Sequence, residues 1–222
     1  MRTFSRERTG KGRGVEIAIV GTGNMARGIG TRAAAAGHGL TLYGTERGKA
    51  AELASELGGS VKAAAVGDPL EGDVVVLALW YPVTLEVAER YGDALAGKVV
   101  VDISNPVNTD TFERIVPDAG SGAEELAAAV PGARVVKAFN TTFAGTLTGG
   151  GGVSGEPLDV FLASDDDEAK QTVARVAEDA GLRPVDVGPL ERAREIEAAG
   201  YLHMVVQEGL GTGSGSALKI LG

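Results

Sequence analysis

One stretch near the N-terminus, Val15 to Gly30, constrains the fold more than any other part of the chain. Its sequence, VEIAIVGTGNMARGIG, places an apolar, β-branched run directly before a glycine-rich turn and a helix-forming segment. An apolar run of this length is typical of a buried strand. Because strand, turn and helix follow one another without a spacer, we expect them to open a βαβ unit.

Each small residue of this turn has a separate physical task. Gly21 permits the sharp turn, Gly23 lets the backbone approach a pyrophosphate, and Ala26 lets the helix pack closely on the strand. The pyrophosphate would lie on the helix N-terminus, where unpaired amides and the helix dipole favour an anion. A purely structural turn is the alternative, but the strand before it and the helix after it favour dinucleotide binding.

The rest of the chain continues the alternation of strand and helix. Apolar runs predict strands at 15–20, 40–43, 58–65, 73–80, 98–103, 133–138, 158–163 and 184–187. Helical patterns occupy 24–37, 46–57, 83–95, 122–130, 168–180 and 191–208. This order predicts an α/β fold, a Rossmann-type doubly wound parallel sheet with a small C-terminal lobe.

Three regions are expected along the 222 residues. Residues 1–14 form a disordered basic leader, for which a nucleic-acid-binding arm is the alternative. Residues 15–140 form the dinucleotide-binding domain. Residues 141–222, which contain the glycine run GGGGVSG, form a smaller lobe that closes the cleft.

Composition excludes several classes of function. The chain has no cysteine, so disulfides and thiolate chemistry are excluded. Its formal charge of -9 disfavours a broad nucleic-acid surface. No apolar run is long enough to span a membrane, and no signal peptide opens the chain. We therefore expect a cytoplasmic protein without nucleic-acid or membrane partners.

The end of the second predicted strand bears on the choice between NAD and NADP. NAD-preferring sites place an acidic residue about 20 residues beyond the turn to bind both ribose hydroxyls. Here Thr45 stands near Arg47 and Lys49, which would accept the additional phosphate of NADP. Glu46 could point to solvent or restore some NAD selectivity, and the two basic residues could simply be a solvated helical turn. We expect NADP(H).

From about Glu16 to Leu221 the chain resembles the NADP oxidoreductase, coenzyme F-420-dependent family. The resemblance rests on GTGNMARGIG, DVVVLALWYP, the NPV within Asp102 to Val107, VVKAFNT and LRPVDVGPLERAREIEA. It implies hydride transfer between NADPH and an 8-hydroxy-5-deazaflavin, coenzyme F-420, or a flavin. Helical transmembrane metalloreductases have a related domain, but this sequence shows no membrane span.

The resemblance also implies which residues bind the cofactor. Thr22, Thr45 and Arg47, with Lys49 as a fourth member, would surround the ribose phosphate. Asn24 and Met25 would cover the pyrophosphate with backbone amides. The rest of the cofactor would be bordered by residues at the carboxyl ends of later strands: Leu79, Trp80, Tyr81, Asn105, Pro106, Ala138 and Asn140. Trp80 and Tyr81 could instead be core or rim aromatics.

Asn140 departs from the family pattern, because the deazaflavin enzyme has a histidine there. Stacking two rings needs shape and exclusion of water more than an ionisable group, so hydride transfer is still expected. Asn140 could hydrogen-bond the nicotinamide carboxamide or a flavin carbonyl, or it could cap its own loop.

No side chain is predicted to act as a catalytic acid or base, and no metal ligands cluster in the sequence. His38 is expected in an exposed turn and His203 as a packing residue of the last helix. Asp165 to Asp167 is expected to cap a helix N-terminus. The protein would position two rings and let the cofactors react.

Two other classes of function remain open. A reductase of a small carbonyl or imine would need an acid or lysine in the cleft, and only Lys137 is near. A non-catalytic NADP-binding sensor would bind the cofactor without oxidising it. The apolar residues of the last helix, including Tyr201 and Leu202, predict a homodimer.

Overall fold

The computed structural model describes residues 14–221, and most of the predicted leader, residues 1–13, lies outside the described residues. The strands are β1 (Glu16–Val20), β2 (Gly39–Gly44), β3 (Lys62–Ala65), β4 (Val74–Leu77), β5 (Val99–Asp102), β6 (Arg134–Lys137), β7 (Gly152–Val153), β8 (Glu156–Pro157), β9 (Asp159–Ala163) and β10 (Arg183–Gly188). The helices are α1 (Asn24–Ala36), α2 (Arg47–Leu57), α3 (Tyr81–Tyr91), α4 (Gly122–Ala129), α5 (Ala144–Thr148), α6 (Asp167–Asp179), α7 (Ala193–Val205) and α8 (Gln207–Leu210), with single 3-10 turns η1 (Gly92–Leu95) and η2 (Leu190–Arg192).

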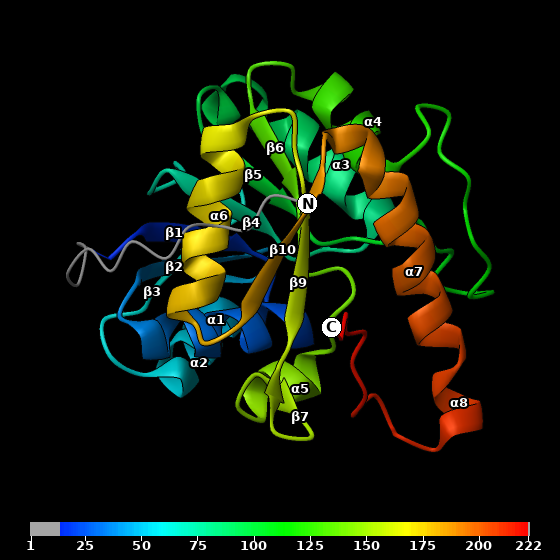
Figure 1. Ribbon diagram of the computed structural model, residues 1–222. Helices are drawn as coiled ribbons and strands as arrows, with labels where there is room; N and C mark the ends of the chain where they lie inside the picture. The colour runs from blue at the N-terminus through cyan, green and yellow to red at the C-terminus, as the bar shows by residue number, and fades with distance from the viewer. Residues whose placement is uncertain (1–13, 222) are drawn as a thin grey trace.

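A central sheet organises these elements (Figure 1). Across residues 14–221 it contains eight strands in the order β10-β9-β6-β5-β4-β1-β2-β3. Neighbouring strands are parallel except β6 and β9, which pair antiparallel through Lys137 and Ala163. The predicted Rossmann-type fold is confirmed. The strand order reverses between β1 and β4, and sheets of this kind bind ligands outside the strand ends at such a point.

Both faces of the sheet are covered by helices. Ile17 and Ile19 of β1 pack into one core together with residues of α1 and α2, whereas Ala18 and Val20 pack into a second core with α3 and α4. This alternation follows from the two-residue repeat of a strand. Burial on both faces explains why the central strands are almost entirely apolar.

The part of the chain after residue 140 contributes to the same sheet. Strands β9 and β10 extend it beyond β6, and the glycine run 149–155 contains β7 and the turn of the small β7-β8 hairpin. In Figure 1 helix α7 and the C-terminal segment lie beside this end of the sheet. The expected division of the chain at residue 140 stays a prediction.

The structure corrects the expected helix at 191–208. Pro189 precedes the short turn η2, α7 begins at Ala193, and the helix ends at Val205 before α8. The Gln207 side chain donates a hydrogen bond to the backbone oxygen of His203 at 2.6 Å. The last helical turn is thereby capped by a side chain, and the chain continues as a separate short helix.

The expectation that His38 is exposed is also wrong, because its side chain is buried. The chain entering β1 crosses the turn after α1, and the Val15 amide donates to His38 Nδ1 at 3.1 Å. Burial lowers the pKa of His38, while the nearby Asp179 carboxylate opposes this effect. His38 therefore fixes the entry into the sheet.

Candidate functional site

The glycine-rich turn joins β1 to α1 at the predicted ligand-binding end of the sheet. Gly21 has a φ of +121°, and a Cβ there would lie 2.4 Å from the carbonyl oxygen of Ala78. Only glycine fits both constraints. A Cβ on Gly23 would meet nothing within 4 Å, so this position opens outward, and Ala26 is fully buried. The local backbone geometry is compatible with the task expected of each residue, and binding of a pyrophosphate here stays a prediction.

The N-terminus of α1 leaves backbone donors for an anion. Its N-cap is Gly23, no side chain caps it, and its first turn contains no acidic residue. Asn24 is exposed and Met25 is half-buried at this end of the helix. The Asn24 side chain is turned to Arg27, whose guanidinium donates to its Oδ1 at 3.3 Å. The donor set therefore fits a pyrophosphate.

A polar cluster follows β2 beside this turn. A Cβ on Gly44 would lie 3.0 Å from Thr22 Cγ2, which places the turn against the end of β2. Thr45 and Arg47 are exposed, and Lys49 Nζ pairs with Glu46 Oε1 at 2.6 Å. Glu46 raises the pKa of Lys49 by accepting this hydrogen bond.

The Glu46 side chain is 64% exposed and forms an ion pair with Lys49, which agrees with the expectation that it points to solvent. Its effect on cofactor choice stays a prediction. The Arg47 guanidinium has no ion pair or hydrogen bond within the described residues. A free guanidinium beside two threonines is a donor set suited to a phosphate monoester.

The end of β4 presents one aromatic ring and buries the other. Leu79 Cδ2 lies 3.4 Å from the Cβ position of Gly21, so it borders the turn. Trp80 is 54% exposed. Tyr81 is buried and donates a short hydrogen bond to Glu125. Burial is the larger cause that raises the pKa of Tyr81, and this hydrogen bond raises it further. The Tyr81 ring therefore packs between α3 and α4.

Asn105 and Asn140 join the ends of β5 and β6 to α7. Asn140 Nδ2 donates to Asn105 Oδ1 and to the backbone oxygen of Ile196, both at 2.9 Å. Asn105 Nδ2 donates in return to the backbone oxygen of Asn140 at 2.9 Å. A Cβ on Gly200 would lie 2.7 Å from Asn105 Oδ1, so α7 can lie this close only because Gly200 has no side chain.

These bonds define what Asn140 can offer to a ligand. Both hydrogens of its amide are donated within the protein, and the Ile196 carbonyl fixes which atom is nitrogen. Only Oδ1 stays without a partner among the described residues. Of the two expected contacts, an N–H group such as a carboxamide fits this oxygen, whereas a flavin carbonyl does not. The Asn140 side chain does not donate to the backbone of its own loop, as the alternative expected, but to Asn105 and Ile196.

Two more polar atoms without partners lie next to this pair. Ser104 Oγ and Thr141 Oγ1 are buried and, within residues 14–221, have no hydrogen-bond partner. Buried polar groups are nearly always hydrogen-bonded in proteins. Their position at the ends of β5 and β6, next to the buried Pro106 and Ala138, fits a polar ring such as nicotinamide. The cofactor contacts of all these residues stay predictions.

A buried ionic cluster that the sequence did not reveal lies next to the Ser104–Asn105 corner, the place where the chain leaves β5. Lys137 Nζ lies 2.8 Å from Asp102 Oδ2, 2.8 Å from Glu197 Oε1 and 2.6 Å from the backbone oxygen of Ser104. All three charged side chains are at most 2% exposed. Burial alone would lower the pKa of Lys137, but the two carboxylates outweigh it and raise the pKa. Burial raises the pKa of Glu197, against the opposing effect of Lys137.

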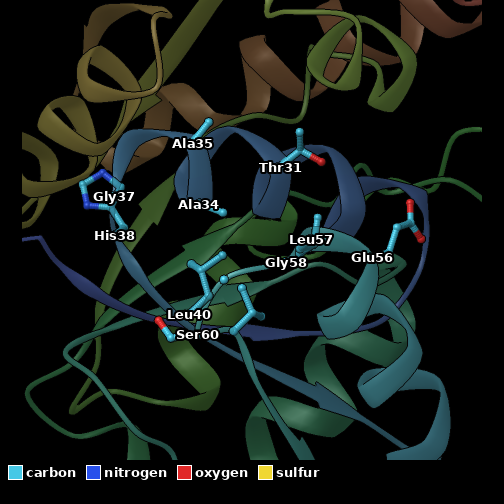
Figure 2. Close-up of a pocket in the computed structure, with 12 residues that line it drawn as sticks. Thr31, Ala34, Ala35, Gly37, His38, Leu40, Glu56, Leu57, Gly58 and Ser60 are labelled. Carbon is cyan, nitrogen blue, oxygen red and sulfur yellow. The ribbon is translucent and has the colours of Figure 1, made fainter.

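A hollow of about 490 Å³ lies away from this site, where α1 and α2 both end (Figure 2). Its lining includes Ala34, Leu40, Leu57 and Ser60. Figure 2 shows His38 at one edge, apart from these side chains. The hollow is at the opposite end of α1 from the glycine-rich turn, so it does not belong to the candidate site.

No helix within residues 14–221 has the length and apolar character needed to cross a membrane. In the same part of the chain, no three histidine, aspartate or glutamate side chains gather in a way that could hold a metal ion.

The sheet order and the glycine-rich turn at the strand-order reversal together define an α/β protein of the Rossmann class. The chain belongs to the NADP oxidoreductase coenzyme F420-dependent family, whose sequence profile matches residues 16–106. The expected family membership is confirmed.

Individual relatives agree with this membership. An F420-dependent NADP reductase of Methanothermobacter thermautotrophicus is 31% identical over 201 residues, which cover 82% of this chain and 85% of that protein. Metalloreductase STEAP3 of Rattus norvegicus is 34% identical over 188 residues, or 82% of this chain but 36% of that protein. A crystal structure from Arthrobacter sp. FB24 matches with a TM-score of 0.83 at 27% identity, and its expected activity is that of an F420-dependent NADP reductase. The match covers 94% of this chain and 100% of the Arthrobacter chain.

The length of these relatives limits what membership implies. The chain spans about a third of the metalloreductase and 59% of an F420-dependent NADP reductase from Methanocaldococcus jannaschii. The whole proteins' electron acceptors are therefore not carried over to this chain by the alignment alone.

Proposed function

We propose that the protein is an NADP(H)-dependent oxidoreductase that transfers hydride between NADPH and a deazaflavin, coenzyme F-420, or a flavin. The observation that carries this proposal is the polar cluster after β2. Arg47 is exposed there and has no ion pair or hydrogen bond within residues 14–221, Thr22 and Thr45 lie at the same end of β2, and Lys49 pairs with Glu46. These groups would bind the 2′-phosphate that distinguishes NADP from NAD.

The remaining cofactor contacts follow from the fold. Backbone amides at Asn24 and Met25 would hold the pyrophosphate, and the residues after β4, β5 and β6 would border the nicotinamide. NADPH supplies the hydride, and a deazaflavin or flavin ring takes it up with one proton from solvent. The protein's part would be to bind the cofactor, align the two rings and exclude water.

The state of Lys137 argues against a carbonyl or imine reductase. All three hydrogens of its ammonium are donated within the protein, and its pKa is raised. Such a group cannot serve as the cleft lysine of that reaction. A non-catalytic sensor stays as an outcome of the test below.

The test is an assay of NADPH and NADH oxidation against F-420, FMN, FAD and a quinone. We expect turnover with F-420 or a flavin and a higher kcat/KM for NADPH than for NADH. Preference for NADH would contradict the cofactor proposal. Tight binding of NADP⁺ without turnover of any acceptor would support the sensor, and turnover only of small carbonyls or imines would support the other class.

The protein would act in the cytoplasm as a homodimer. Four exposed apolar side chains lie on α7, on α8 and at the residue between them: Leu202, Val205, Val206 and Leu210. Paired with the same face of a second copy, they would form an isologous contact. Light scattering at micromolar concentration should give twice the chain mass, and Leu202→Asp should reduce it to one chain. A monomeric wild-type protein would contradict this assembly.

A further inference from the structure

Helix α7 contacts the ends of β5 and β6 through charged side chains that are almost completely buried. Glu197, near the middle of α7, accepts hydrogen bonds from the backbone amides of Gly122 at 3.1 Å and Ala123 at 3.3 Å. Those amides begin α4, where an anion is favoured by free donors and the helix dipole. Glu197 therefore connects three elements: its own helix, the start of α4 and Lys137 on β6.

The same cluster fixes the backbone where β5 ends. Asp102 Oδ1 accepts from the Ser104 amide at 2.8 Å, and Lys137 Nζ donates to the Ser104 carbonyl at 2.6 Å. Both backbone groups of Ser104 are thus held by the cluster. The next residue, Asn105, pairs its side-chain amide with Asn140, whose Nδ2 also donates to the Ile196 carbonyl of α7.

Geometry explains why one lysine can serve all these partners. Asp102 and Lys137 are register partners at the carboxyl ends of adjacent parallel strands. Their side chains lie on neighbouring positions, and the ammonium has three hydrogens for three acceptors. Without Lys137, the carboxylates of Asp102 and Glu197 would share a buried space without a counter-charge, which would drive α7 away from the sheet.

We propose that Lys137 is a positioning residue that fixes α7 and the Ser104–Asn105 corner against each other before any ligand binds. This inference rests on the proposed function for its kinetic consequence, because the nicotinamide ring would lie against this corner, whereas the pyrophosphate and 2′-phosphate of the cofactor would be bound elsewhere. The phosphate-binding turn is held by β1, α1 and β2 and does not contact the cluster. Loss of Lys137 would therefore affect the transfer of hydride more than the binding of NADP⁺.

The chain provides a matched control in Lys170. This lysine is also buried, 5% exposed, and its Nζ lies 3.0 Å from Asp186 and 3.2 Å from the Gly188 carbonyl. It joins α6 to β10 and touches neither α7 nor the Ser104 corner. Lys170→Met thus removes a buried ionic contact of the same kind at another place.

The experiment compares Lys137→Met with Lys170→Met in the full chain. We expect both variants to lower the unfolding temperature. Lys137→Met alone should lower kcat/KM for the acceptor by about tenfold to a hundredfold, because small displacements of reacting groups have effects of this size. The Kd of NADP⁺, measured by calorimetry, should stay within about threefold of wild type. Equal kinetic effects in both variants, or parallel losses of NADP⁺ affinity and turnover, would overturn the inference.

A second measurement does not depend on turnover. Hydrogen exchange of backbone amides should become faster in α7 and at 103–106 in Lys137→Met, but not in α1, and should be unchanged there in Lys170→Met. If Lys137→Met does not fold, Glu197→Asp keeps the charge but shortens its reach, and the same pattern is expected. If wild type turns over no acceptor, the proposed function fails, and the exchange data alone decide the inference: no difference in α7 would refute it.

Discussion

The two sides of the candidate cleft are built on different principles. On the side of β1, α1 and β2, ligand contacts come from backbone amides and from exposed side chains such as Thr45 and Arg47. On the side of β5, β6 and α7, buried side chains bond one another, as Lys137 and Glu197 do. The first side leaves its polar groups free for a ligand, whereas the second uses most of them to hold the protein together.

This difference predicts a separation of effects. Substitutions on the first side should change cofactor affinity and leave stability nearly constant. Substitutions on the second side should change stability and the alignment of the rings. The proposed difference between the two sides is wrong if substitutions on the first side lower stability, or if substitutions on the second side change only cofactor affinity.

The largest effect is expected for Glu197→Ala. It leaves Lys137 with one carboxylate and leaves the Gly122 and Ala123 amides without their acceptor. Removing one partner of a buried ion pair costs about 3–5 kcal/mol of unfolding free energy. Urea unfolding measures this loss, and Glu195→Ala, which alters an exposed residue of the same helix, is the control. A loss no larger than that of the control would show that the cluster does not hold α7.

A smaller effect, on affinity, is expected for Arg47→Ala. Loss of charge-assisted bonds to a phosphate should weaken NADPH binding by about tenfold to a hundredfold. NADH lacks this phosphate, so its binding should hardly change, and the urea midpoint should equal that of wild type. Arg192→Ala, another exposed arginine, serves as the control. Equal weakening of NADPH and NADH would place Arg47 away from the ribose phosphate.

The smallest effect concerns pH. His203 of α7 is buried, with Nδ1 3.1 Å from the Thr141 carbonyl and Nε2 2.8 Å from Ser216 Oγ. Burial lowers its pKa, against the effect of the Thr141 bond. The unfolded chain therefore binds a proton below about pH 6.5 that the folded chain resists, so stability falls as pH falls, by less than about 1.4 kcal/mol per pH unit.

The test compares urea midpoints at neutral and mildly acidic pH. His203→Gln should show a weaker loss of stability on acidification than wild type. Because burial also lowers the pKa of His38, His38→Gln should reduce the remaining loss. An unchanged pH dependence in His203→Gln would show that the His203 contacts do not resist protonation.

Local patterns made the first side predictable from the sequence. The tasks of Gly21 and Ala26 depend on neighbours within one βαβ unit, so spacing alone identifies them. The same holds for the strands and helices of the sheet, whose apolar periodicity is local. The buried His38 was missed because its partner, Val15, reaches it only once the strand entry is folded.

The second side depends on contacts between distant segments. Lys137 and Glu197 are 60 positions apart, and although both lie in segments that carry the family resemblance, neither segment indicates that the two side chains pair. A weak indication was present: Lys137 interrupts an apolar strand, and a charge in a buried strand needs a partner. The sequence could not identify the partner, because α7 meets β6 only through the antiparallel placement of β9 and β10.

The burial of the Lys137 cluster has a consequence for ionic strength. Mobile ions screen charges in contact with water within about 10 Å at 0.1 M salt, but they screen buried pairs much less. Added salt should thus weaken the attraction between Arg47 and a phosphate while the docking of α7 stays the same. In concentrated electrolyte, the side formed by β5, β6 and α7 would keep its shape even as the proposed binding of the cofactor phosphate weakened.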